Sequence, residues 1–198
     1  MRIVGGAFSG RVLAAPKSLT IRPSSDRLRE SLFNILAHSY GDAARGARLL
    51  DLFAGTGALG LEAMSRGAKF ALFIDDGAEA RALIRQNVEA LGLGGTTRIF
   101  RRDATRLGLV HPVEPFTLGF LDPPYRHRLA ERSLASLRDG GWLVPGALVV
   151  VEEAADAGFA PPPGYGEIER RRYDDTELVF LESAVSGPQA GAHPSISA

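Results

Sequence analysis

The sequence predicts a doubly wound α/β fold whose mostly parallel sheet carries a C-terminal antiparallel hairpin and a small N-terminal β-hairpin extension. Three observations favour this fold. Apolar, strand-like segments alternate with helical segments between residues 47 and 154, as in parallel sheets built from right-handed crossovers. A glycine-rich turn joins the first strand of this series to the helix that follows it. Near the C-terminal end, only Asp174 and Asp175 separate two strand-like segments, and so short a connection requires an antiparallel pair.

The elements before residue 47 precede this alternating series. Residues 2–14 contain two short apolar segments around Gly10, which predicts a hairpin or a ragged strand pair. Residues 22–41 predict a helix, because residues 24–26 supply N-cap candidates and Gly41 closes the segment. The apolar positions of this helix recur at helical spacing and are Leu28, Leu32, Ile35 and Leu36.

The alternating series continues to the C-terminal hairpin. Strands are expected at residues 47–53, 69–75, 97–103, 117–122 and 147–154, and helices at residues 58–66, 77–92 and 129–141. The fifth strand is almost continuously apolar, which is typical of a strand buried on both faces. A proline-rich connection at residues 160–166 leads to the hairpin of residues 167–183, and residues 184–198 are expected to be a disordered tail. Ligands of such a sheet bind at the carboxyl ends of its strands.

Composition excludes several classes of protein. The chain has 198 residues, enough for one domain, and contains no cysteine; its four histidines show no ligand-like spacing, so we expect neither disulfides nor a metal site. No segment has the pattern of a secretory signal or of a membrane span, so we expect a cytoplasmic protein without membrane contact. The net charge is zero, yet residues 1–30 hold six basic and two acidic side chains, a local charge of +4.

The glycine-rich turn fits two kinds of nucleotide-like ligand. Gly55, Gly57 and Gly60 form a G-x-G-x-x-G pattern between a strand and a helix, and Asp75 lies twenty residues beyond Gly55, as in dinucleotide-binding proteins. Asp51 argues against a dinucleotide, because its carboxylate would face the pyrophosphate at a helix N-terminus suited to anions. S-adenosylmethionine carries a sulfonium and an ammonium group and no phosphate, so an acid beside this turn attracts it. In either case Asp75 is placed to accept hydrogen bonds from ribose hydroxyls.

Several of these residues have a purely structural alternative. The glycines could only form the turn, and Asp75 or Asp76 could cap the helix that begins after Gly77. Asp103 ends the third strand, where it could cap a helix or accept from an adenine amino group. An acid at the end of each of three strands favours a ligand site, since independent caps need not share one edge of the sheet.

The fourth strand runs into the sequence Asp122-Pro123-Pro124-Tyr125, which suits a reaction at an exocyclic amino group. The nitrogen of such a group is a poor nucleophile, because its lone pair is delocalised into the base. The Asp122 carboxylate and the Pro123 carbonyl could accept hydrogen bonds from its two N–H groups, which would free the lone pair. Tyr125 offers a face on which the base can stack. The alternative is a turn with an exposed aromatic ring. Arg126, His127 and Arg128 could hold phosphates or form a solvated loop.

A family resemblance rests on five stretches in family order and at roughly family spacing. They are "MRIVGG", the Gly10–Arg11 pair, "RPSSDRLRESLFNIL", "LLDLFAGTGALGLEAMSRGA" and "LDPPY", and they extend the match from residue 1 to about residue 183. These stretches resemble the bacterial small-subunit ribosomal RNA guanine-N2 methyltransferases of the RsmD type. The segment of residues 22–36 is far more specific than the glycine turn.

The resemblance implies a class I methyltransferase (Rossmann-like) sheet, S-adenosyl-L-methionine as the methyl donor, and the N2 amino group of a guanine in 16S ribosomal RNA as the target. The partner would be 16S ribosomal RNA or a small-subunit assembly particle, and we expect a monomer. Residues 1–22 match the family's RNA-contacting extension, and residues 23–183 match the methyltransferase domain. Phosphate contacts by the basic extension would add affinity and salt dependence.

The resemblance also implies roles for particular residues. The cofactor site would consist of Asp51, Phe53, Ala54, Gly55, Gly57, Asp75, Asp76, Asp103 and Ala104. Within it, Asp51 and the glycine turn would line the methionine end, Asp75 would bind the ribose, and Asp103 would lie near the adenine. The catalytic site for the base would be Asp122, Pro123, Pro124 and Tyr125, and the RNA contacts would be Arg2, Arg11, Arg22, Arg27, Arg126 and Arg128. The chain departs from the family at "FIDD", where glutamate is expected, so either Asp75 or Asp76 could bind the ribose.

The sequence is also compatible with three other functions. An adenine-N6 nucleic-acid methyltransferase would use the same acid-Pro-Pro-aromatic motif, and only the N-terminal match argues against it. A catalytically silent RNA-binding or assembly protein would not need the intact glycine turn and the Asp122–Tyr125 motif. A dinucleotide oxidoreductase is disfavoured by Asp51 and by the two prolines.

Overall fold

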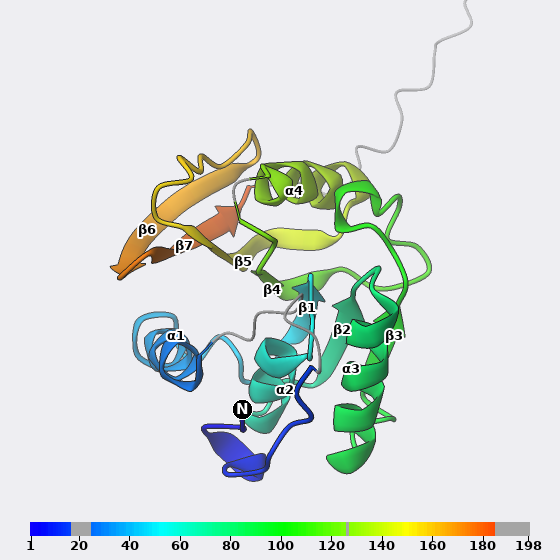
Figure 1. Ribbon diagram of the computed structural model, residues 1–198. Coiled ribbons are helices and arrows are strands. Elements are labelled where there is room, and N and C mark those ends of the chain that lie inside the picture. The colour runs from blue at the N-terminus through cyan, green and yellow to red at the C-terminus, as the bar shows by residue number, and fades with distance from the viewer. Residues whose placement is uncertain (17–24, 126, 185–198) are drawn as a thin grey trace, which may run out of the picture.

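A seven-stranded sheet with helices on both faces forms the body of the protein (Figure 1). The computed structural model describes residues 1–16, 25–125 and 127–184. The strands are β1 (Arg48–Leu52), β2 (Phe70–Ile74), β3 (Thr97–Phe100), β4 (Phe116–Leu121), β5 (Leu143–Ala154), β6 (Tyr165–Tyr173) and β7 (Thr176–Ser183). The helices are α1 (Asp26–Ser39), α2 (Ala58–Ser65), α3 (Ala78–Ala90) and α4 (Leu129–Gly140), with two 3-10 helices, η1 (Gly6–Phe8) and η2 (Ala104–Arg106).

The strand order is β3-β2-β1-β4-β5-β7-β6, which confirms the predicted doubly wound sheet with a C-terminal hairpin. The first five strands in this order are parallel, whereas β7 is antiparallel to both β5 and β6. The order reverses between β1 and β4, which is where ligands bind in open α/β sheets. The main differences from the predicted elements are that β5 begins at Leu143, that β3 ends at Phe100, and that η2 was not expected.

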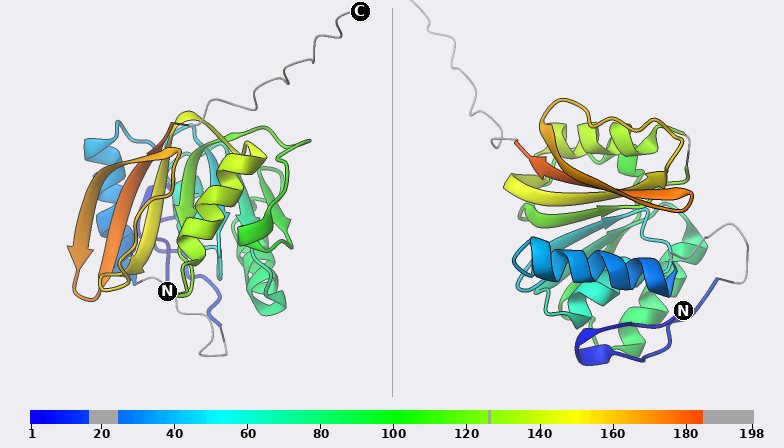
Figure 2. Two further views of the ribbon diagram at one scale, coloured as in Figure 1. Left: turned by 90° about the horizontal axis from the view of Figure 1, so that it is seen from above. Right: turned by 90° about the vertical axis from the view of Figure 1, so that its left-hand side faces the viewer.

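Side-chain alternation divides the core into two layers, one on each face of the sheet. On one face, Leu49, Phe73 and Phe120 pack with apolar residues of α1, α2 and α3. On the other, Leu50 and Leu121 pack with α4 and the buried Trp142. Figure 2 shows the corresponding layers, with α1 across one face and α4 on the other. The site residues described below lie on the face covered by α1, α2 and α3.

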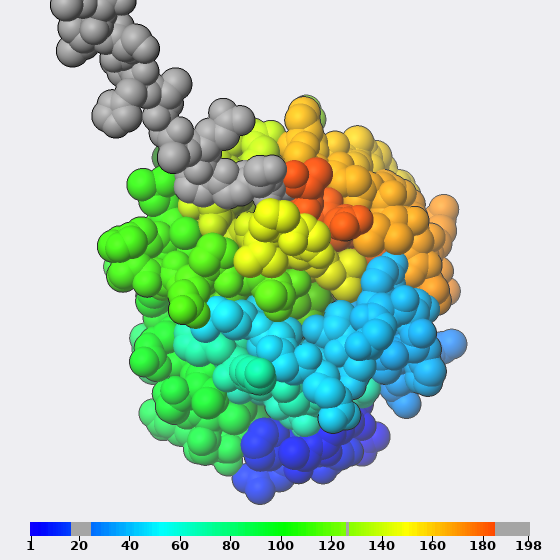
Figure 3. Space-filling model, turned by 180° about the vertical axis from the view of Figure 1, so that it is seen from behind, coloured from blue at the N-terminus to red at the C-terminus, as the bar shows by residue number. Residues whose placement is uncertain are grey.

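The N-terminal segment, residues 1–16, packs against the domain. The prediction of a hairpin or ragged strand pair is confirmed in its ragged form: Arg2 and Val12 form an antiparallel bridge around η1, and the N–H of Ile3 donates to the carbonyl of Arg11 at 2.9 Å. The fully buried carboxylate of Glu62 in α2 accepts from the backbone N–H groups of Val4 and Gly5, each at 2.8 Å. The segment forms the dark blue lower edge of the molecule in Figure 3. The segment is also bonded to α3, because the N–H of Ala14 donates to Oδ1 of Asn87 at 2.7 Å, so more than one helix anchors it to the fold.

Arg29 explains part of the "RPSSDRLRESLFNIL" stretch in structural terms. Its side chain is fully buried, and its Nη2 donates to the carbonyl of Arg2 at 2.6 Å and to Asp26 Oδ1 at 2.7 Å. Ser25 caps α1 by accepting from the N–H of Leu28 at 3.1 Å, as the sequence predicted. Arg29 therefore ties the N-terminal segment to α1 and contributes no charge to the surface. The predicted tail falls, apart from Ala184, outside the described residues.

Candidate active site

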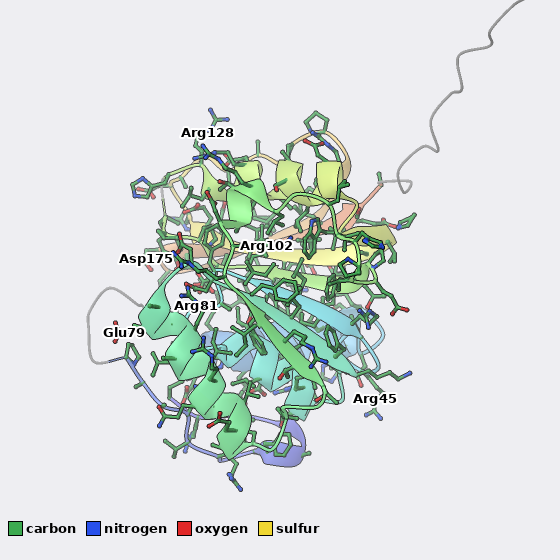
Figure 4. All side chains as sticks on the ribbon, turned by 90° about the vertical axis from the view of Figure 1, so that its right-hand side faces the viewer. Arg45, Glu79, Arg81, Arg102, Arg128 and Asp175 are labelled. Atoms are coloured by element: carbon green, nitrogen blue, oxygen red, sulfur yellow. The ribbon has the colours of Figure 1, made fainter. Side chains whose placement is uncertain are left out.

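A large cavity lies at the carboxyl ends of the strands, on the face covered by α1, α2 and α3. Its volume is about 1170 Å³, and it extends from the glycine turn to the turn between β6 and β7. Figure 4 shows Glu79 of α3 and Asp175 of the β6–β7 turn on the same side of the molecule, with Arg45 at the opposite end. The cavity thus reaches across most of the sheet edge.

The walls of this cavity are strongly acidic. Eight acidic side chains line it: Asp51, Asp75, Asp76, Glu79, Asp122, Glu152, Asp174 and Asp175. Among the described residues, the basic side chains that line it are Arg27 and Arg172, both exposed. A cavity with this balance attracts a cation and repels a phosphate.

Strand register explains why acids from distant parts of the sequence meet here. Leu52 of β1 pairs with Ile74 of β2 and with Leu121 of β4, so Asp75 and Asp122 follow at the same level of the sheet. Leu121 pairs in turn with Val151 of β5, which places Glu152 beside Asp122. Three carboxylates from three strands therefore share one rim.

The glycine turn has the backbone conformations that its sequence requires. Phe53, Gly55 and Gly57 have φ values of 57°, 55° and 78°, in the left-handed region that favours glycine. Gly60 serves close packing, since a Cβ at this position would lie 2.3 Å from Cε1 of Phe73 and 2.9 Å from Oδ2 of Asp51. The first two glycines therefore shape the turn, and Gly60 lets α2 approach the sheet.

Asp75 holds the turn in place from the next strand. Its Oδ2 accepts from the N–H of Gly55 at 2.9 Å, and its Oδ1 accepts from the N–H of Gly77 at 2.8 Å. Burial raises the pKa of Asp75, and these two backbone hydrogen bonds oppose that rise. A carboxylate has about four acceptor positions, so Asp75 keeps acceptor capacity toward the cavity. Asp75 thus lines the cavity and holds the turn, but it does not cap α3, whose N-cap is Gly77 and lacks a side-chain capping hydrogen bond.

Asp51 is the most deeply buried acid of the site. Its side chain is 2% exposed, and its Oδ2 accepts from the N–H of Gly60 at 2.9 Å. Burial raises the pKa of Asp51 to about 8, and the charge of Asp75 adds to this rise. A cationic ligand in the cavity would favour the ionised form of Asp51, so this carboxyl group is suited to recognising a positive charge.

The Asp122–Tyr125 motif forms the part of the wall that follows β4, the strand next to β1. All four of its residues line the cavity; Pro123 is buried, and Asp122 and Tyr125 are partly buried. The hydroxyl of Tyr125 donates to Oε1 of Glu152 at 2.8 Å and lies 3.3 Å from Oγ1 of Thr176. Burial first, and then the charge of Glu152, raises the pKa of this hydroxyl. Tyr125 therefore stays a neutral hydrogen-bond donor.

Most of the predicted cofactor residues meet in this cavity. Asp51, Phe53, Ala54, Gly55, Asp75 and Asp76 line it, whereas Gly57 shapes the turn as the N-cap of α2. Asp103 and Ala104 do not line it. The Oδ1 of Asp103 accepts from the N–H of Thr105 at 2.8 Å and from its hydroxyl at 2.7 Å, so Asp103 is the N-cap of η2. The capping role considered for Asp103 is therefore observed, and its place near an adenine stays a prediction.

The four described members of the predicted RNA-contacting arginines belong to different segments of the chain, namely residues 1–16, α1 and the start of α4. Arg27 lines the cavity. Arg2 lies 3.7 Å from Asp26, and Arg11 donates to the carbonyl of Ala90 at 2.9 Å. Arg128 is exposed at the start of α4, as Figure 4 shows. Arg22 and Arg126 lie outside the described residues.

Glu152, Arg172 and Thr176 are cavity residues that the sequence analysis did not select. A signal for Glu152 was present, since "VVVEEA" ends the fifth parallel strand with acids, as the other strands end. No comparable signal marks Arg172 and Thr176, because the hairpin turn reaches the cavity only through the order β5-β7-β6.

The described part of the chain contains no helix that could span a membrane, and no group of three His, Cys, Asp or Glu side chains in it is placed to hold a metal ion.

Comparisons with known proteins agree with this geometry. The family described as conserved hypothetical protein 95 matches residues 1–182. Ribosomal RNA small subunit methyltransferase D of Escherichia coli is 40% identical over 173 residues, which are 87% of this chain and 84% of that protein. The solved structure of the Escherichia coli protein yhhF, proposed to be a methyltransferase, aligns with a TM-score of 0.79 at 32% identity and covers 94% of this chain and 99% of that chain.

A more distant structure shares the fold alone. The tRNA (uracil-54, C5)-methyltransferase of Pyrococcus abyssi, solved with S-adenosyl-L-homocysteine, aligns with a TM-score of 0.61 at 19% identity and covers 83% of this chain and 40% of that chain. The sheet described here is therefore that of class I methyltransferases.

Proposed function

Because this chain belongs to the family described as conserved hypothetical protein 95, and its relatives include ribosomal RNA small subunit methyltransferase D, we infer that it is a ribosomal RNA methyltransferase. The observation that carries this inference is the joining of Asp122–Tyr125 and the glycine turn in one cavity. The first suits an amino group as methyl acceptor, and the second suits a nucleoside-like methyl donor.

We propose S-adenosyl-L-methionine as the cofactor, because the residues of the cavity fit its charge. When bound, this cofactor supplies an electrophilic methyl group on a positively charged sulfur. Asp51 favours a positive charge beside the glycine turn, and Asp75 or Asp76 can accept from ribose hydroxyls. A dinucleotide would bring its pyrophosphate among these acids, which disfavours an oxidoreductase. Asp103, which caps η2 through Oδ1, stays the proposed acceptor for the adenine amino group.

We further propose that the methyl acceptor is the N2 amino group of a guanine in 16S ribosomal RNA. The Asp122 carboxylate and the Pro123 carbonyl would accept hydrogen bonds from its two N–H groups. These hydrogen bonds strengthen as the nitrogen gains positive charge in the transition state. The two prolines restrict the backbone, so the Pro123 carbonyl is held with little conformational freedom. The proton can leave after the transfer, so no strong base is required.

The RNA strand would lie outside the acidic cavity and insert only the target base. Arg27 and Arg172 lie at its wall and would hold phosphates on either side of that base. Residues 1–22 remain a proposed additional RNA contact, with Arg2 and Arg11 as its described exposed cations. Small ribosomal subunits, or particles on the way to them, would be encountered in the cytoplasm, with the enzyme acting as a monomer.

The test is methyl transfer to small ribosomal subunits from a strain lacking the gene for this protein. Purified protein and S-adenosyl-L-methionine carrying a labelled methyl group would be incubated with these subunits and, separately, with naked 16S RNA. Nucleoside mass analysis should show N2-methylguanosine formed by the wild-type protein. Formation of N6-methyladenosine would support the adenine-specific alternative, and no labelled nucleoside in either substrate would reject the proposed function.

A further inference from the structure

Glu152 links the aromatic ring of the base site to the C-terminal half of the sheet. We propose that Glu152, a buried residue of β5, is a positioning residue. It accepts a hydrogen bond from the Tyr125 hydroxyl and so fixes the ring on which the target base stacks. This inference rests on the proposed function, because it assigns a partner to Tyr125 in that reaction.

The hydrogen bonds of Tyr125 come from two strands that the Asp122–Tyr125 motif does not belong to. Glu152 of β5 accepts from the hydroxyl at 2.8 Å, and Thr176, the first residue of β7, lies 3.3 Å from the same oxygen. Glu152 and Thr176 are 7% and 6% exposed. The far end of the ring is therefore held by buried groups of a regular sheet, whereas its near end belongs to the turn after β4.

Packing alone does not explain a carboxylate at this position. Burial of a carboxylate costs free energy that its hydrogen bonds must offset, and an apolar residue would continue the run of Leu148 to Val151 at no such cost. The strand register places Glu152 next to Asp122, and alternation along β5 turns it to the same face as Val150, toward α1. The carboxylate thus stands where it can meet the hydroxyl of Tyr125 while Asp122 faces the same cavity.

A fixed ring would matter for the rate more than for RNA affinity. Transfer requires the amino group to meet the methyl group in line, and a base stacked on a ring that moves would sample that geometry less often. The phosphate contacts that dominate RNA affinity lie elsewhere. Loss of the hydrogen bond should therefore lower kcat and leave the KM for the RNA substrate nearly unchanged.

The experiment is a double-mutant cycle between Glu152→Ala and Tyr125→Phe, measured with small subunits as substrate. Tyr125→Phe keeps the ring and removes only the hydroxyl. Each single substitution should lower kcat by about three- to tenfold, the effect of freeing one side chain, and the double substitution should lower it no further. Glu152→Gln should recover most of the rate, because its amide oxygen still accepts from the hydroxyl.

The matched control is Glu153→Ala. Glu153 is also buried and is the next residue in β5, but it does not line the cavity. Titration of each variant with S-adenosyl-L-methionine by calorimetry gives the fraction of folded sites, so kcat can be corrected for misfolding. The corrected kcat of Glu153→Ala should match that of the wild type.

Four results would overturn the role of Glu152. The first is a double variant in which the two losses of kcat multiply, and the second is a Glu152→Gln variant as slow as Glu152→Ala. The third is an equal loss of kcat in the Glu153→Ala control, and the fourth is a Tyr125→Phe variant with wild-type kcat. The last result decides the matter even if Glu152→Ala does not fold. An inactive wild-type protein would instead reject the proposed function, so the two failures are distinguishable.

Discussion

The substitution Asp51→Asn should make the protein more stable and less able to bind a cation. Burial raises the pKa of Asp51 from 3.8 to about 8. Between these values the folded protein holds a proton that the unfolded chain has released, so the free energy of unfolding falls as the pH rises. Asparagine keeps the shape of the side chain, and its amide oxygen can still accept from the N–H of Gly60.

The magnitude follows from proton linkage. The free energy of unfolding of the wild type should fall by at most about 1.4 kcal/mol per pH unit through Asp51, which amounts to about 2 kcal/mol between pH 6 and pH 8. The loss ends above about pH 8, where both states are ionised. Asp75, whose pKa is also raised by burial, is present in both proteins, so the difference reports Asp51 together with its electrostatic coupling to Asp75.

Urea denaturation followed by circular dichroism at pH 6, 7 and 8 measures this difference. From pH 6 to pH 8, the free energy of unfolding of the variant should rise relative to that of the wild type by about 2 kcal/mol, which corresponds to about 4–8 °C in Tm. Asp139→Asn, which removes a carboxylate that is 68% exposed, is the control for the loss of one charge. Parallel pH profiles for the wild type and Asp51→Asn would show that Asp51 ionises normally in the folded protein and would refute the reasoning.

The same carboxyl group should couple cofactor binding to proton release. Near pH 7 Asp51 is mostly protonated in the free protein, and a sulfonium in the cavity favours its ionised form. The binding of S-adenosyl-L-methionine can be measured by calorimetry in buffers of different ionisation enthalpy. The wild type should release protons on binding, whereas Asp51→Asn should release fewer protons and bind the cofactor more weakly. Equal proton release by both proteins would remove Asp51 from cofactor recognition.

Three further substitutions test other parts of the site. Asp122→Asn should lower kcat by about 100-fold or more while calorimetry shows unchanged cofactor affinity, because the lost charge acts on the transition state; wild-type turnover would reject this role. Gly60→Ala should destabilise the protein by about 1–3 kcal/mol or more, since the new Cβ meets Phe73 and Asp51, and an unchanged Tm would contradict the close packing of α2. Replacing Arg27 and Arg172 by glutamine should reduce the salt dependence of RNA binding by about one charge per contact, and an unaltered slope would exclude both from the phosphate path.

The sequence alone determined the order and type of the main elements. Hydrophobic period and turn residues are local properties, so the alternation of residues 47–154, the glycine turn and the two-residue hairpin connection could all be read directly. The positions of Asp51, Asp75 and Asp122 also followed, because parallel strands present their carboxyl ends at one edge. The chemical suitability of Asp122–Tyr125 needed no coordinates.

Only the tertiary structure decided which of these local possibilities is realised. Asp103 ends a strand as the other acids do, but η2 begins beside it and uses its carboxylate as a cap. Arg29 belongs to a basic segment by sequence, yet it is buried and holds the carbonyl of Arg2. Glu152 and Thr176 reach Tyr125 across separations of 27 and 51 residues. Such contacts depend on strand order and register, which the spacing of residues along one strand does not encode.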